Sequence, residues 1–242
     1  MENSLWTFGC SFTAEYHPID NDPPTTYDFY KQYNGGELPK VWPEQLSEKL
    51  ALKYENKGRG ATSNASIFYS FCNFCDKLQE GDVVIVQWTT IYRFLLANDN
   101  LGELCDILPS CEYPDNEYDM DLITAMLVNR SNLIWIDELI SYSKIINEIC
   151  KEKKVKLFYW TYAENEVFSY MQDNWDGFSW DNILTYKEHG RVEGLLIKMG
   201  IDTNNRHTID NETNGEVVDA HLGKLGHEAQ ANYFYKIIKK QI

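Results

Sequence analysis

A short run of mostly β-branched residues, Val83-Val84-Ile85-Val86-Gln87-Trp88, constrains the fold more than any other stretch of the chain. It is apolar on both faces, which is typical of a strand in a parallel sheet that helices cover on both sides. Similar but shorter or less regular runs at residues 5–8, 53–56 and 155–160 predict neighbouring strands. We therefore expect a central, mainly parallel sheet.

Segments with helical periodicity alternate with these strands. Apolar residues recur every three or four positions over 42–52, 129–153 and 225–240, and a further helix begins at Ser63 or Asn64. The helix over 129–153 is expected to face inward through Leu133, Ile136, Ile140, Ile145 and Ile149. This alternation implies an α/β fold with helices on both faces of the sheet. With 242 residues and no repeat or linker, the chain is expected to form one domain over 1–242.

Three stretches lack a regular pattern. Residues 14–40 hold several prolines and an Asn-Gly-Gly turn, so we expect a long insertion loop there. Long loops are often functional, and the tyrosines of this one would suit a sugar-binding groove, although an insertion packed on the surface explains them equally well. Residues 98–121 are acidic and irregular, and residues 163–214 form a mixed, aromatic-rich region.

The charge balance argues against two classes of partner. The chain has 22 basic and 37 acidic residues, which gives a formal net charge of -15. A general nucleic-acid binder needs a cationic face, and so does a protein that binds an anionic membrane. We therefore expect neither nucleic acid nor a membrane as partner, whereas the oligomeric state, including a homo-oligomer, stays open.

The sequence carries no sign of export, metal or cofactor. Its first residues lack the features of a signal peptide, and no apolar run is long enough to span a membrane. The six cysteines are scattered, so we expect reduced thiols in a cytoplasmic protein, with a virion-associated one as the alternative. His, Asp and Glu residues do not fall at metal-ligand spacing, and we expect no metal and no cofactor.

Polar residues that could do chemistry follow the predicted strands. They are Ser11 after the first strand, the turn Gly58–Asn64 after the second, Thr89 after the third, and Asp219 and His221 after a later one. Ligands of open α/β sheets bind beyond the carboxyl ends of the strands, so these residues should converge on one edge. A serine attacks a carbonyl when a base removes its proton, usually a histidine that a carboxylate orients. Asp219 and His221, two positions apart on an extended segment, can share one face.

Three short motifs resemble the blocks of a known family, the SGNH hydrolases or GDSL esterases. Gly9-Cys10-Ser11 is similar to the family's Gly-Asp-Ser, Asn56–Asn64 resembles its second block, and Asp219-Ala220-His221 resembles the block before its last helix. The resemblance implies a flavodoxin-like, three-layer α/β/α sandwich and ester hydrolysis or acyl transfer.

The same resemblance implies a role for each matched residue. Ser11 would be the nucleophile, His221 the general base and Asp219 the residue that orients His221. The backbone amides of Ser11 and of Gly60 or Ala61 would bind the oxyanion of the tetrahedral intermediate.

The chain departs from the family pattern at two places. Cys10 stands where the family has Asp, and the third block, Gly-x-Asn-Asp, has no counterpart after the central strand. The side chain of Gln87, Thr89 or Asn64 would have to replace the missing asparagine as an oxyanion donor.

Together these features favour a serine esterase that removes a small O-acyl group, such as acetyl, from a small-molecule or polysaccharide ester through an acyl-enzyme on Ser11. A carbohydrate O-acyltransferase would use the same site. A catalytically silent carbohydrate-binding or virion structural protein is the third reading. The missing asparagine favours that reading, whereas the joint presence of Ser11, Asp219 and His221 argues against it.

Other candidates have simpler structural explanations. Cys72 and Cys75 have the spacing of a redox or metal pair, but both fall on the apolar face of a predicted helix. His227 could replace His221 as the base, although we expect it to pack in the first turn of the last helix. Cys10 should point into the sheet. One acidic cluster would suit glycosidase chemistry, but a solvated loop explains it better: Asp173, Asp176 and Asp181.

Overall fold

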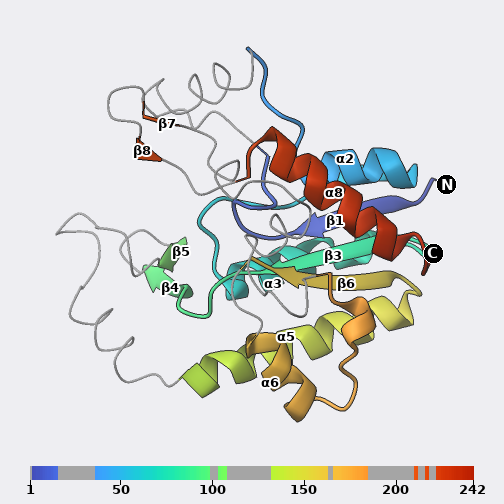
Figure 1. The fold of residues 1–242 in the computed structure, drawn as a ribbon. Coiled ribbons are helices and arrows are strands. Elements are labelled where there is room, and N and C mark those ends of the chain that lie inside the picture. Colours follow the sequence, from blue (N-terminus) through green and yellow to red (C-terminus); the bar gives the residue numbers. More distant parts are fainter. Residues whose placement is uncertain are drawn as a thin grey trace.

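The central sheet has four parallel strands in the order β2-β1-β3-β6 (Figure 1). This computed structural model describes residues 2–15, 36–98, 103–107, 132–162, 166–184, 210–211, 216–217 and 222–242. The strands are β1 (Ser4–Phe8), β2 (Lys53–Asn56), β3 (Val83–Trp88) and β6 (Lys156–Thr161). A parallel bridge from Tyr159 to Ile183 extends the sheet beyond β6. The four predicted strands and their parallel pairing are confirmed.

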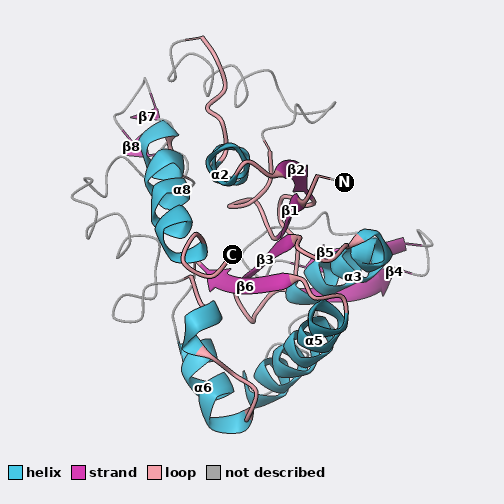
Figure 2. Cartoon of the chain, turned by 90° about the vertical axis from the view of Figure 1, so that its right-hand side faces the viewer, coloured by secondary structure: helices cyan, strands magenta, loops and turns pink. Residues whose placement is uncertain are grey.

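Helices cover both faces of this sheet, as Figure 2 shows. One face carries α2 (Trp42–Leu50) and α8 (Lys224–Ile238), and the other carries α3 (Asn64–Phe74), α5 (Asn132–Glu152) and α6 (Glu166–Asn174). Two single 3-10 turns, η1 (Cys75–Lys77) and η2 (Trp180–Asn182), follow α3 and α6. The predicted three-layer α/β/α sandwich is thus the fold of the chain. Because β1 lies between β2 and β3, the strand order reverses between β1 and β3, where open α/β sheets bind their ligands.

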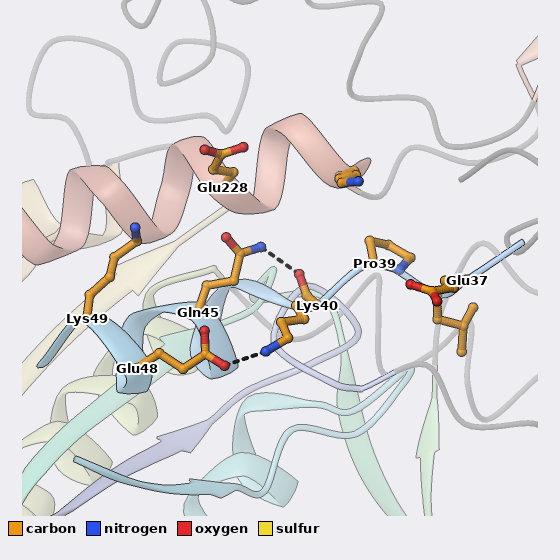
Figure 3. Close-up of a pocket in the computed structure, with 9 residues that line it drawn as sticks. Glu37, Pro39, Lys40, Gln45, Glu48, Lys49 and Glu228 are labelled. Carbon is orange, nitrogen blue, oxygen red and sulfur yellow. Dashed lines mark hydrogen bonds and ion pairs between the residues drawn. The ribbon is translucent and has the colours of Figure 1, made fainter. Parts of the chain in front are cut away.

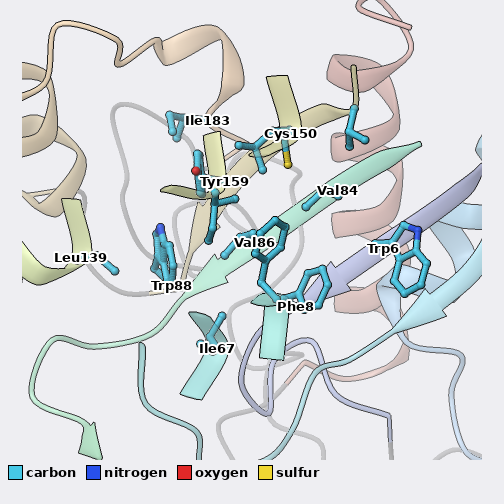
Figure 4. Packing of buried hydrophobic residues seen from close by; sticks show 14 of the residues in the cluster. Trp6, Phe8, Ile67, Val84, Val86, Trp88, Leu139, Cys150, Tyr159 and Ile183 are labelled. Atoms are coloured by element: carbon cyan, nitrogen blue, oxygen red, sulfur yellow. The ribbon is translucent and has the colours of Figure 1, made fainter. Parts of the chain in front are cut away.

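Side chains alternate along the strands between two separate cores. On β3, one set packs against α3 and α5 (Figure 4), namely Val84, Val86 and Trp88. The other set packs against α2 and α8, namely Val83 and Ile85. By the same alternation, Gln87 points toward the α2 and α8 side, where Cys10 is also buried. A polar side chain of the central strand is therefore placed beneath the turn that follows β1.

A hairpin forms where the sequence predicted an irregular, acidic excursion. Strands β4 (Phe94–Asn98) and β5 (Glu103–Ile107) pair antiparallel, and Figure 1 places them beyond the carboxyl ends of the sheet strands. The prediction that residues 98–121 are irregular was wrong for 103–107, which form β5. The acidic residues of β5 hid the strand, and one of them, Asp106, is held by hydrogen bonds to α3 rather than by solvent.

Among the predicted inward side chains of α5 that the structure describes, one differs from the prediction. Ile145 is 46% exposed, whereas its neighbour Ile146 is 0% exposed. Ile146 lies seven residues after Leu139, which is also buried, so the two stand on one side of the helix. The two isoleucines are adjacent in sequence, and the periodicity of the segment did not decide between them.

Some predictions concern parts of the chain outside the described residues. Most of the expected insertion loop, 16–35, is among them, as are 185–209 in the aromatic-rich region. The single-domain prediction also stays a prediction. Within the described stretches, no helix is both long enough and apolar enough to cross a membrane.

The buried carboxylate of Asp82 joins the starts of β1 and β3. Asp82 is 2% exposed and accepts hydrogen bonds from Ser4 N at 2.7 Å, Trp6 Nε1 at 3.0 Å and Gln79 N at 3.0 Å. Asp82→Leu leaves these donors buried without an acceptor, so we expect the free energy of unfolding to fall by about 3 kcal/mol. Urea unfolding measures it. Asp82→Asn keeps one acceptor oxygen and should lose about half as much, and a Leu variant as stable as wild type contradicts the prediction.

The stability of the fold should decrease in alkaline solution because two buried acids resist ionisation. Burial, and secondarily the nearby Cys75, raises the pKa of the Cys150 thiol to about 12. Burial likewise raises the pKa of Tyr159 well above its ordinary value. Both groups ionise more readily in the unfolded chain, so their contribution is complete below about pH 9 and is lost as the pH rises toward 12.

Urea unfolding of the wild type and of Cys150→Ala between pH 8 and 11 isolates the thiol. We expect the stability advantage of the wild type to shrink by about 1.4 kcal/mol per pH unit above pH 9.5. An advantage that is constant over this range would show that the thiol does not resist ionisation.

Candidate functional site

Ser11 lies in a tight turn directly after β1, at the carboxyl edge of the sheet. The amides of Thr13 and Ala14 donate to the carbonyl of Cys10 at 2.8 and 3.0 Å, which closes the turn. Ser11 itself is half-buried. At Gly9 a Cβ would lie 2.5 Å from Gln87 Oε1, so the close approach of β3 to the turn requires glycine.

Gln87 holds this turn from below. Its Oε1 accepts from Cys10 N at 3.2 Å and from Thr13 Oγ1 at 2.5 Å, and its Nε2 lies 3.1 Å from Cys10 Sγ. Gln87 and Cys10 are both 0% exposed. The predicted inward orientation of Cys10 is confirmed, and the side-chain amide of Gln87 is committed to the turn on either side of Ser11.

The segment Asn56–Asn64, which resembles the family's second block and which we call the second-block loop, packs closely on the same turn. Arg59 N donates to Gly9 O at 3.0 Å, and Asn56 Nδ2 donates to Thr13 O at 2.7 Å. A Cβ at Gly58 would lie 2.8 Å from the carbonyl carbon of Thr13, so this contact also depends on glycine. The structure thus brings the Ser11 turn and the loop of the predicted oxyanion amides together.

The two predicted amide donors sit at the exposed tip of that loop. Gly60 has nothing within 4 Å of the place where a Cβ would be, so a ligand can approach its backbone closely. Ala61 has a φ of 61°, in the left-handed region that non-glycine residues rarely adopt. Backbone strain of this kind is concentrated at functional sites.

Asn64 and Thr89 connect the second-block loop to the segment after β3. Asn64 Oδ1 accepts from Thr89 N at 2.8 Å, and Asn64 Nδ2 donates to Thr89 O at 3.2 Å and to Thr90 O at 3.4 Å. Thr89 Oγ1 lies 3.2 Å from the Tyr162 hydroxyl. Tyr162 stacks on Phe12 with ring centroids 4.3 Å apart. These contacts connect the start of α3, the segment after β3 and Tyr162 to Phe12, the residue after Ser11.

His227 is a buried residue in the first turn of α8, as predicted. It is 3% exposed, and its Nδ1 accepts from Trp42 N at 3.2 Å. The indole of Trp42 donates to Phe12 O at 2.8 Å, so this histidine is joined through α2 to the Ser11 turn. Nδ1 must be unprotonated to accept this bond.

Asp219 and His221 lie outside the described residues, and their roles remain predictions. The same applies to His17, His189 and His207. The cysteines Cys72 and Cys75 are free thiols, and both are partly exposed rather than fully buried. Asp173, Asp176 and Asp181 are solvent-exposed as predicted, but only Asp176 lies in a loop, since Asp173 belongs to α6 and Asp181 to η2. Across the described stretches, no group of three His, Cys, Asp or Glu side chains is arranged to hold a metal ion.

Three residues make contacts near the site that no sequence motif predicted. Asp106 caps α3 from the β4–β5 hairpin by accepting from Ser63 N at 2.8 Å and Ser66 Oγ at 2.7 Å. Tyr162, directly after β6, stacks on Phe12 beside Ser11, and Arg93, before β4, lines a pocket together with Asn64. No local pattern marks such long-range contacts; only the position of Tyr162 just after a strand was a signal.

A separate pocket of about 420 Å³ lies between α2 and α8 (Figure 3). Its charged lining is balanced, with the acidic Glu37, Glu48 and Glu228 and the basic Lys40, Lys49 and Lys224. Lys40 is paired with Glu48, and Gln45 Nε2 donates to Lys40 O at 2.7 Å. Among the described residues, those predicted for the site do not line this pocket.

Comparison with known proteins gives structural matches but no sequence matches. No protein-family profile matches the chain, and no curated protein does. Among solved structures, the chain is similar to a protein assigned to the lipolytic G-D-S-L family from Desulfitobacterium hafniense, with a TM-score of 0.42, 11% identity and coverage of 97% of this chain and 99% of the other.

Two further similar structures are longer than this chain. The YxiM protein of Bacillus subtilis has a TM-score of 0.48 and 14% identity, and the match covers 100% of this chain and 57% of that one. A carbohydrate esterase, described as having divergent catalytic and non-catalytic binding functions at its active site, has a TM-score of 0.49 and 8% identity. That match covers 98% of this chain and 65% of the esterase.

Proposed function

We propose that the chain is an SGNH-type serine esterase that removes a small O-acyl group from a carbohydrate. The observation that carries this proposal is the position of Ser11, in a tight turn at the strand-order reversal between β1 and β3. The exposed backbone of the second-block loop is hydrogen-bonded to that turn. A nucleophile and a set of backbone donors held together in this way are what acyl transfer needs.

In the proposed reaction the Ser11 hydroxyl attacks the ester carbonyl while His221 takes its proton. The tetrahedral intermediate collapses, the C–O bond to the sugar breaks, and His221 returns the proton to the departing sugar hydroxyl. Water then attacks the acyl-enzyme with the same histidine as base. The carboxylic acid is released and the Ser11 hydroxyl is regenerated. Asp219 orients His221 throughout. His227 is left out of these steps because its Nδ1 is bonded to the Trp42 backbone.

Backbone amides are the proposed oxyanion donors. We assign this role to Ser11 N and to the amide of Gly60 or Ala61, because the loop tip is open to a ligand. Among the side chains considered for the missing asparagine, Thr89 is 2% exposed and its hydroxyl lies 3.2 Å from the Tyr162 hydroxyl. Asn64 and Gln87 instead hold neighbouring loops in place through both of their polar atoms, so we assign them positioning roles.

A serine-reactive fluorophosphonate tests the proposal directly. We expect the native protein to be labelled at one residue, and peptide mass spectrometry to identify it as Ser11. Heat-denatured protein and Ser11→Ala should remain unlabelled. Absence of labelling in the folded protein, or labelling elsewhere, would overturn the proposal and favour a silent carbohydrate-binding protein.

The O-acyltransferase alternative shares the acyl-enzyme and is separated by its product. The enzyme would be incubated in water with an isotopically labelled acetyl ester and with sugar acceptors. An esterase would release labelled acetate, whereas a transferase would form a labelled acetylated sugar. Acetate as the main product, even with a large excess of acceptor, is the result expected here.

A further inference from the structure

Two pockets adjoin along α3 and begin at the Ser11 turn. The first, of about 430 Å³, lies between the second-block loop and α3, and Gly9 and Arg59 are part of its lining. The second, of about 270 Å³, lies between α3, the segment before β4 and α5. Tyr69 and Leu95 line both pockets. We call this pair of pockets the α3 groove.

An arginine with an unused nitrogen stands in each half or at its edge. In the second pocket, Arg93 NH1 is buried and has no hydrogen-bond partner. A buried donor without an acceptor costs free energy. The Arg93 side chain as a whole is only partly buried, so a rotation that turns NH1 into the pocket would let an incoming ligand oxygen recover that cost. In the first pocket, Arg59 is exposed, and its guanidinium makes no ion pair within the described stretches. Neither guanidinium forms an ion pair with a described residue, although the net charge of the chain is -15.

The acidic residues of the groove do not neutralise these arginines through direct contacts. Asp106 Oδ1 accepts from Ser63 N and Ser66 Oγ at the start of α3. Glu138 lines the second pocket, yet Arg93 NH1 remains without an acceptor. Guanidinium groups bind carboxylates through paired N–H donors, so an acidic group on the ligand fits the unused nitrogens.

The remaining lining suits a saccharide. The ring of Tyr69, 49% exposed, stands where the two pockets meet, and aromatic rings stack on sugar faces. Ser66, Ser70 and Asn73 add hydroxyl and amide groups along the first pocket. These side chains can exchange hydrogen bonds with sugar hydroxyls.

We propose that the α3 groove binds the chain of an acidic polysaccharide, with Arg59 and Arg93 pairing with its carboxylates and Tyr69 stacking on a ring between them. This inference rests on the proposed function, because it places the acylated sugar of such a chain at Ser11. It deepens that function by naming uronate-containing glycans as the substrate class.

Binding to the Ser11→Ala protein tests the groove without turnover. Isothermal titration calorimetry would use oligosaccharides of galacturonate, of mannuronate and of hyaluronan, each beside its carboxyl-reduced counterpart. We expect at least one uronate oligomer to bind at least 10-fold more tightly than its reduced form. Arg93→Met and Arg59→Gln should each weaken that binding at least 10-fold, and Arg93→Lys, which keeps the charge but not the paired donors, should weaken it as well. Lys240→Gln, an equal charge change beyond the end of α8 on the opposite face, is the matched control.

Three results would overturn the inference. One is equal affinity for the acidic and reduced forms of every oligomer, and another is binding that the arginine variants do not change while they remain folded in urea titrations. The third is equally tight binding of polyglutamate or of a sulfated neutral oligosaccharide, which would indicate a general anion-binding surface. Uronate binding without fluorophosphonate labelling would disprove the esterase proposal and support the α3 groove as a binding site. Fluorophosphonate labelling without a preference for uronates would support the esterase proposal and disprove the groove inference.

Discussion

Ser11→Ala is expected to lower kcat/KM for p-nitrophenyl acetate at pH 8 by about a thousandfold or more, to the rate of the buffer. In the proposed mechanism the Ser11 hydroxyl forms the acyl-enzyme, so its removal would leave the backbone donors and the histidine with no nucleophile to assist. Because Ser11 is half-buried in a turn closed by backbone bonds, we expect the free energy of unfolding to change by less than about 1 kcal/mol.

The matched control for this variant is Ser141→Ala. Ser141 is an exposed serine of α5 whose hydroxyl bonds only to Asp137 O at 2.9 Å, and its loss should leave turnover unchanged. Equal turnover by the wild type and Ser11→Ala would show that Ser11 is not the nucleophile for this ester. Fluorophosphonate labelling would then separate a selective enzyme from a silent fold.

Gln87→Leu is expected to reduce kcat by about 100-fold and the free energy of unfolding by about 3 kcal/mol. The substitution leaves Cys10 N and Thr13 Oγ1 buried without their common acceptor, at a cost of about 1–3 kcal/mol for each. The turn between these two residues carries Ser11, and displacement of a nucleophile by about 1 Å is enough for a 100-fold loss of rate. Stopped-flow or steady-state assays and urea unfolding measure the two effects on the same protein.

A graded series separates positioning from simple loss of stability. Thr13→Val removes one of the two contacts and keeps the bond from Cys10 N, so its kcat should lie between those of the wild type and Gln87→Leu. Asp82→Leu, expected to lose a comparable free energy of unfolding of about 3 kcal/mol at the opposite end of β3, should keep the wild-type kcat. If Gln87→Leu is destabilised but turns over at the wild-type rate, Gln87 supports the fold only.

The sheet and its helices were predictable because their signals are local. The apolar run of β3 and the periodicity of α2, α5 and α8 need no knowledge of distant residues. The β4–β5 hairpin was missed because its pairing and the capping of α3 by Asp106 are long-range, and acidic residues within β5 disguise it. Local propensity is a weak guide where tertiary contacts decide the conformation.

The candidate site was predictable in position but less so in the work of its side chains. Motif order and strand ends indicated that Ser11 and the second-block loop meet, which their hydrogen bonds now show. Asn64 and Gln87 were expected as oxyanion donors, yet they bond to loops 25 and 77 residues away in sequence. The sequence shows which polar side chains are present, whereas the hydrogen-bond partner of each side chain depends on the folded structure.

The contacts of Trp42 have a consequence for how this chain would look to coevolution methods. Its indole bonds to the main-chain carbonyl of Phe12, and its own main-chain amide bonds to the imidazole of His227. Each contact pairs a side chain with a backbone atom, so neither constrains the identity of the residue on the other side. In an alignment of relatives, positions 12, 42 and 227 could therefore change independently, and correlated substitutions would not reveal that the Ser11 turn is joined through Trp42 to the last helix.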